Sequence, residues 1–263
     1  MTISASRRIT VSAKHFLAAW LFISKEETRY YLNGVLIEPH PDGGVIMAAT
    51  DGHALIAIRD RKARFEGDQS FICTIPKSFA AIMKGKGFRQ IHFIGDTAYV
   101  TNEEWADQNL DAEQDPAQIT ENHLAVAWAP PIDGIFPDWR KVANWPKDSG
   151  KLLRTSNLNG RLITRFADAT ALIIGDKTSP ALKIYTPDEH PGQKDKPWVM
   201  SANPTVIRAP LCPDLFGLIM PMHFAQGELI DEQQFPAWLG LPEPAKPAAA
   251  NDAASPDAKT GAA

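Results

Sequence analysis

Asp51 and His53 are the side chains of this sequence whose types and spacing first suggest chemistry. They stand two residues apart in ATDGHALIAI, which runs from Ala49 to Ile58. A carboxylate beside an imidazole can orient a general base or supply two metal ligands. The chain has no HExxH motif, no second histidine at ligand spacing and no glycine-rich phosphate loop. We therefore expect no catalysis, no metal and no cofactor, with a hydrolase that uses Asp51 and His53 as the outside alternative.

Composition indicates an ordinary globular protein. The 263 residues are 44% hydrophobic and 22% charged, enough for one large domain or two small ones with real cores. A formal net charge of -4 gives no general attraction to nucleic acid, so any basic face has to be local. Cys73 and Cys212 form no CxxC motif, which argues against a disulfide framework or a cysteine zinc site. The apolar stretch FLAAWLFI lacks a cleavage site and is too short to span a bilayer, so we expect a cytoplasmic protein.

Asp51 and His53 lie within a repeated sequence pattern that predicts strands and helices. A strand is expected at 7–12, 70–76 and 151–155, and amphipathic helices at 12–25, 76–87 and 156–169. Two or three β-rich segments follow each helix. This β-α-β-β-β rhythm predicts an α+β fold with antiparallel sheets and helices on one face. Asn33-Gly34 and Asp51-Gly52 are expected at turns or close approaches.

Two stretches interrupt the pattern. Residues 103–121 are acidic and rich in turn formers, which predicts a surface insertion. From residue 225 the chain is rich in Ala and Pro, which predicts a disordered tail.

The bases of this acidic chain gather on the expected helices. The candidates share helix faces or flank them, and they are Lys14, Lys77, Lys84, Lys86, Arg154, Arg161 and Arg165. One interpretation is a solvated face opposite the core. The other is contact with the phosphate backbone of DNA.

Several segments, in order, resemble one family, the bacterial replicative sliding clamp, which is the beta subunit of DNA polymerase III. TRYYLNGVLIE (28–38) and ATDGHALIAI (49–58) look like its central domain, and FPDWRKV (136–142) like the join to its C-terminal domain, where the family usually has Tyr at the position of Trp139. LIMPMHF (218–224) is similar to its C-terminal end. The resemblance implies a central-domain-like region at 1–145, a shortened C-terminal-domain-like region at 146–224 and the tail at 225–263. The family's N-terminal domain and part of its C-terminal domain are missing.

The resemblance also implies a function without catalysis. A clamp encircles double-stranded DNA as an oligomer and tethers DNA polymerase or other partners, whose short Gln- and Leu-rich peptides with an aromatic end dock in a hydrophobic cleft. We thus expect a processivity or accessory factor of DNA replication or repair. The matched cleft positions are Leu32, Thr50, Gly52, His53, Leu55, Pro137, Lys141, Val142, Leu218, Met220, Pro221 and Met222. Ala54 and Lys141 stand where the family often has Arg.

Two alternatives stay open within this interpretation. The protein could be an adaptor or competitor that keeps the cleft and binds clamp partners without encircling DNA. The segment EQQFPAWLGL (232–241) could dock in a clamp cleft or pack against its own domain.

Overall fold

The computed structural model describes seven stretches of the chain, residues 7–67, 69–84, 89–102, 116–142, 158–176, 180–185 and 204–222. All of them belong to one compact unit that runs from Met1 to Met222. The tail from residue 225, the strand expected at 151–155, Lys86 and Arg154 lie outside the described residues. What was predicted for them stays a prediction.

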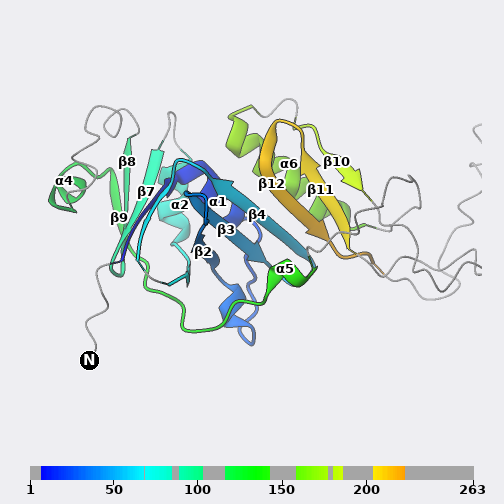
Figure 1. Ribbon diagram of the computed structural model, residues 1–263, viewed down its shortest axis with the longest axis horizontal. Coiled ribbons are helices and arrows are strands. Elements are labelled where there is room, and N and C mark those ends of the chain that lie inside the picture. Colours follow the sequence, from blue (N-terminus) through cyan, green and yellow to red (C-terminus); the bar gives the residue numbers. More distant parts are fainter. Residues whose placement is uncertain are drawn as a thin grey trace, which may run out of the picture. The chain divides into compact units, whose positions relative to one another are not determined.

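Two antiparallel sheets form the framework (Figure 1). The five strands of the first are, in spatial order, β5 (Arg64–Glu66), β1 (Arg8–Ser12), β7 (Arg89–Ile94), β8 (Thr97–Asn102) and β9 (Ala125–Trp128). The seven strands of the second are β10 (Lys183–Tyr185), β11 (Thr205–Ala209), β12 (Cys212–Ile219), β4 (Ala54–Asp60), β3 (Val45–Thr50), β2 (Val35–Pro39) and β6 (Phe71–Cys73). Strand β1 begins the first β-α-β-β-β repeat and β6 begins the second. Because β1 pairs with β7 of the second repeat and β6 pairs with β2 of the first, each repeat places its first strand in the other repeat's sheet.

Two turns follow from glycine chemistry. The β2–β3 hairpin closes through Gly43 and Gly44, which have φ 83° and 80° and stand in the turn sequence PDGG (41–44). The strand β2 begins only at Val35, because Tyr30–Leu32 form a short 3-10 helix, η1. A Cβ on Gly34 would lie 2.7 Å from the Cys73 carbonyl oxygen, so the chain can pass β6 this closely only with glycine.

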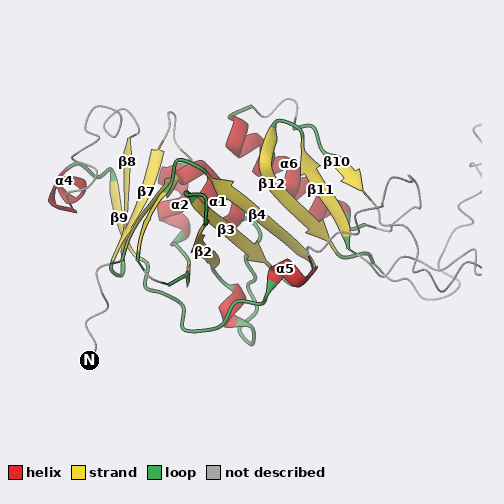
Figure 2. Ribbon diagram, in the orientation of Figure 1, coloured by secondary structure: helices red, strands yellow, loops and turns green. Residues whose placement is uncertain are grey.

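The helices are coloured red in Figure 2. They are α1 (Ala13–Trp20), α2 (Lys77–Met83), α4 (Pro116–Glu121), α5 (Trp139–Val142) and α6 (Gly160–Ile174). The side chain of Asn159 caps the start of α6 by accepting from the Arg161 N–H at 3.0 Å, and Gly175 ends it at φ 76°. No helix in the described stretches is long and apolar enough to cross a membrane.

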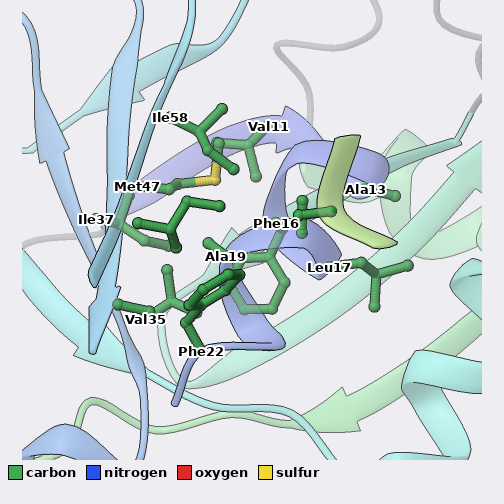
Figure 3. Close-up of a cluster of buried hydrophobic side chains, with 14 of the residues drawn as sticks. Val11, Ala13, Phe16, Leu17, Ala19, Phe22, Val35, Ile37, Met47 and Ile58 are labelled. Carbon is green, nitrogen blue, oxygen red and sulfur yellow. The ribbon is translucent and has the colours of Figure 1, made fainter. Parts of the chain in front are cut away.

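The main core lies between these helices and the sheets. Phe16 and Phe22, in and just after α1, are fully buried against Val35, Ile37 and Met47 (Figure 3). α6 joins this core because the Phe166 ring lies 4.6 Å from the Phe22 ring. Helices α1 and α6 therefore cover one face of the seven-stranded sheet, which confirms the α+β class, whereas the short α5 packs on the opposite face through Trp139.

The opposite face of that sheet has its own cover. Along β2, Val35 and Ile37 point to the helices, whereas Leu36 belongs to a second cluster with Ala48, Ala57 and Ile72. Side chains from the segment 132–139 pack on this second cluster. We call this side, away from α1 and α6, the outer face.

Two details differ from the sequence prediction. The region 103–121 includes α4, whose Ile119 is fully buried, so the insertion is not purely a surface feature. The short strand β5, which pairs with β1, was not predicted because three residues give no readable alternation.

Candidate functional site

Strand register brings distant residues into one row on the outer face. Thr50 pairs with Leu55, Leu55 with Leu218, Leu218 with Val206, and Val206 with Tyr185. Directly paired residues point to the same side of a sheet. The row therefore crosses β3, β4, β12, β11 and β10 and joins the two regions in which the family motifs lie.

The middle of this row is an apolar floor. Leu55, Val206 and Leu218 are buried together, with Trp139 and Phe216 packed against them. Trp139 also contacts the second cluster, so its indole bridges both parts of the outer face.

Helix α5 is fixed over this floor by Arg140. Its guanidinium lies 4.3 Å from the centre of the Trp139 ring and pairs with Glu38 at 2.5 Å. Beside it, the exposed Lys141 ammonium lies 3.4 Å from Asp138. Helix α5 ends at Val142, and Pro137 is exposed just before the helix begins.

The turn between β3 and β4 forms one rim of the floor. The Thr50 hydroxyl donates to the Ala54 carbonyl at 2.8 Å and accepts from the Gly52 N–H at 3.0 Å. Gly52 has φ 89°, a left-handed conformation that favours glycine, and the Arg29 guanidinium lies 2.6 Å from where a Cβ would stand. The predicted close approach at Asp51-Gly52 is confirmed.

The end of β12 forms the facing rim. The Met220 N–H donates to the His53 carbonyl at 2.8 Å, which joins the two rims directly. Met220 and Met222 are 43% and 40% exposed. Pro221 is half-buried between them. The His53 side chain is 70% exposed, so an apolar floor is flanked by two accessible thioethers and an accessible imidazole.

One predicted cleft residue, Leu32, is not part of the cluster of Leu55, Val206 and Leu218. Leu32 is buried, and its carbonyl accepts from the Ser24 N–H at 2.8 Å. Leu32 is the last residue of η1 and anchors this short helix in the interior.

The side chains of Asp51 and His53 are not hydrogen-bonded to each other. The His53 Nδ1 lies 4.0 Å from the nearer Asp51 oxygen, beyond hydrogen-bond distance. That oxygen accepts the N–H groups of His53 and Ala54, both at 2.9 Å, and the other accepts from Arg165 at 2.5 Å. The described stretches also contain no group of three His, Cys, Asp or Glu that could hold a metal ion.

The predicted DNA-facing bases divide into two kinds. Lys77 and Lys84 are exposed on and just after α2, and Arg161 is exposed at the start of α6. Arg165 is engaged with Asp51. The Lys14 ammonium lies beside Gly175 at the end of α6, 3.5 Å from where a Cβ would stand, a position in which a cation favours the helix C-terminus.

Sequence reasoning missed three residues and one ion pair of the site. Val206 and Tyr185 complete the row, and Phe216 packs against it. The Arg165–Asp51 ion pair fixes the rim at the β3–β4 turn. The alternation in PTVIRAP could have placed Val206 beside Leu218. No local pattern could have paired Arg165 with Asp51.

Comparisons with known proteins give a consistent relationship. Proteins described as Beta sliding clamp from two strains of Caulobacter vibrioides are each 31% identical over 160 residues, which cover 59% of this chain and 37% of theirs. The chain thus spans little more than a third of the length of these curated relatives. No protein-family model matches.

Solved structures include polymerase III beta of Caulobacter crescentus, at 18% identity and a TM-score of 0.47, covering 85% of this chain and 68% of that one. The sliding clamp of Pseudomonas aeruginosa has 13% identity and the same TM-score of 0.47, covering 85% and 69%. The predicted resemblance is confirmed by the sequence match: over 160 residues, this chain is similar to proteins described as Beta sliding clamp.

Proposed function

We propose that this protein is a sliding-clamp-like accessory factor of DNA replication or repair that binds partner peptides on the outer face. The site, called the cleft from here on, consists of the floor (Leu55, Val206, Leu218, Trp139) and the rims at His53 and at Met220–Met222. It is a binding site and performs no chemistry. Its occupant is a short segment of a polymerase or another DNA-processing protein, with apolar side chains for the floor.

The observation that carries this proposal is the exposure of Met220 and Met222 beside the apolar cluster of Leu55, Val206 and Leu218. A thioether is flexible and polarizable, so it adapts to different partner side chains. Packing alone would bury such residues, yet both remain about 40% exposed while Leu218, in the same segment, is buried. A peptide that covers them would remove apolar surface from water.

Binding to DNA is the second part of the proposal. Lys77 and Lys84 belong to the helical layer, on the side opposite the cleft, and no ion pair holds either of them within the described residues. Such lysines can contact phosphates without reading sequence. The peptide and the duplex would then use opposite faces of the protein.

Encircling DNA needs several copies, and two sheet edges could join them. β9 ends the five-stranded sheet and β10 ends the seven-stranded sheet among the described strands. Both expose large apolar side chains: Val126 and Trp128 are 53% and 67% exposed, and Ile184 and Tyr185 are 43% and 41% exposed. Unpaired apolar edges favour strand addition, and head-to-tail pairing of unlike edges gives rings or filaments.

The test is fluorescence anisotropy of a labelled Gln- and Leu-rich peptide with an aromatic end, titrated with the full chain. We expect saturable binding with a Kd on the order of micromolar. Met222→Ala should weaken it about fivefold or more, because part of the apolar contact is lost.

Ile82→Ala is the matched control. Ile82 is 41% exposed and apolar like Met222, but it lies on α2, on the helix side. Its removal should leave peptide affinity within about twofold. Equal losses in both variants, or no binding by the wild-type chain, would contradict a peptide site at the cleft.

A further inference from the structure

Arg165 of α6 and Asp51 of the β3–β4 turn form an ion pair beside the cleft. The Arg165 Nη1 lies 2.5 Å from Asp51 Oδ2, and the aspartate side chain is only 16% exposed. Asp51 lies in the motif at 49–58, just before β4, whereas Arg165 lies on α6, which packs against β12.

Asp51 uses its two oxygens for two tasks. Oδ1 accepts the main-chain N–H groups of His53 and Ala54, which fixes the conformation of the turn. Oδ2 is left for Arg165. A carboxylate with donors on both oxygens has one orientation, so Arg165 sets the direction from which Asp51 holds the turn.

The β3–β4 turn also holds the rim at Met220–Met222. The carbonyl of His53 accepts the Met220 N–H at 2.8 Å, immediately after β12 ends. A chain of contacts therefore runs from the Arg165 guanidinium through the Asp51 carboxylate and the His53 backbone to Met220. Each link is a hydrogen bond or an ion pair, and the last one positions an exposed thioether of the cleft.

Electrostatics agree with this geometry. Burial alone raises the pKa of Asp51, yet the N–H groups of Ala54 and His53 and the Arg165 charge bring it below its usual value. The carboxylate is thus ionised at neutral pH and available to the guanidinium. Arg29, which packs on Gly52 and pairs with Glu26, is the next charged pair beside the turn.

We propose that Arg165 is a positioning residue for the cleft, which acts through Asp51 to hold His53 and Met220 in place, and is not a contact to DNA. This inference rests on the proposed peptide-binding function. It assigns Arg165 a role distinct from that of Arg161, one turn earlier on the same helix.

The first measurement is peptide affinity for Arg165→Gln, Asp51→Asn and the double variant. Asn keeps an oxygen for the two N–H groups but removes the charge that Arg165 needs. Each single change should weaken binding about five- to tenfold, and the double variant should be no weaker than the worse single one. Arg165→Lys should recover affinity to within about threefold of wild type, because it restores the charge without the planar fork.

Arg161→Gln is the matched control. It removes the same charge from the same helix, but Arg161 is exposed at the start of α6 and its side chain does not touch the turn among the described contacts. Its peptide affinity should equal that of wild type. Multiplicative losses in the double variant, or an unchanged affinity for Arg165→Gln, would overturn the positioning role.

The second measurement needs no peptide. Amide hydrogen exchange at Met220 should accelerate about fivefold in Arg165→Gln, while exchange in the central strand β7 stays unchanged, as local opening requires. Unchanged exchange at Met220 overturns the inference. If the wild-type chain binds no peptide but this amide accelerates, the proposed function fails while the positioning contact stands.

Discussion

Leu218 of β12 lies directly opposite Leu55 of β4, and this pair joins the two regions of the chain into one sheet. The seam is held at both ends: Arg61 donates to both Asp214 oxygens at 2.7 and 2.8 Å, and Met220 donates to the His53 carbonyl. The cleft floor is therefore part of the fold, whereas the methionine rim is not buried. The two parts of the cleft should respond differently to mutation.

We predict that Leu55→Ala destabilises the protein strongly and Met222→Ala does not. Removing a buried leucine leaves a cavity and costs about 2–5 kcal/mol of unfolding free energy. Met222 is 40% exposed, so its truncation should cost less than about 1 kcal/mol. Urea denaturation measures both values. Similar losses would mean that Met222 is packed as core in solution.

The exposed lysines of α2 should carry part of any DNA affinity. We expect Lys77→Glu with Lys84→Glu to weaken retention on duplex DNA at low salt and to lower the salt slope by about 2, one per lost phosphate contact. The control pair, Lys62→Glu with Lys183→Glu, makes the same change of charge at exposed positions away from α2. DNA retention that falls equally in both pairs would reflect net charge alone.

Trp128 should govern self-association. It is 67% exposed at the edge strand β9, so Trp128→Lys adds a charge where an incoming strand would pack. Sedimentation velocity over a range of concentrations should show oligomers for wild type and a shift to monomer for the variant. A wild-type chain that stays monomeric throughout would favour the adaptor that never encircles DNA.

Sequence patterns predicted elements better than contacts between them. The alternation in the motif strands and the apolar stripes of the helices located most of the described elements, because each depends on neighbours within a few residues. The row Thr50–Leu55–Leu218 was within reach only through the family resemblance, since strand register between β4 and β12 is a long-range property. The contact of Arg165 is also a long-range property. Its spacing on α6 suggested a DNA-facing base, but its ion-pair partner, Asp51, lies in a turn far away in sequence.

Gly217 shows another long-range constraint, and it leads to a prediction. A Cβ at this position of β12 would stand 2.7 Å from Cζ of the Phe166 ring, closer than carbon atoms approach, and this buried ring is itself packed against the Phe22 ring at 4.6 Å. Gly217→Ala should therefore destabilise the protein by about 1–3 kcal/mol. Gly160→Ala is the control, because no atom lies within 4 Å of its Cβ position and alanine favours a helix. Thermal unfolding that is equal in both variants would show that the ring can move aside.

His92 should make stability depend on pH. It is fully buried between Thr10 and Thr101, whose hydroxyls lie 2.9 Å from Nδ1 and 2.8 Å from Nε2. Burial, with a smaller effect of the Arg8 charge, lowers its pKa from 6.5 to about 4. Below pH 6.5 the unfolded chain binds a proton that the folded protein does not bind until about pH 4, so stability falls as the pH falls through this window.

The expected loss attributable to His92 between pH 7 and pH 4.5 is about 2–3 kcal/mol. His92→Gln cannot take up that proton, so its unfolding free energy should fall less over the same interval. Buried carboxylates such as Asp60, whose pKa is lowered by His15 and by the N–H groups of Ser12 and Lys62 against the raising effect of burial, contribute equally to both proteins. The difference between the unfolding free energies of wild type and His92→Gln, measured by urea denaturation at each pH, therefore isolates the contribution of His92. If the two proteins lose stability in parallel, the pKa of His92 is not lowered in the folded state.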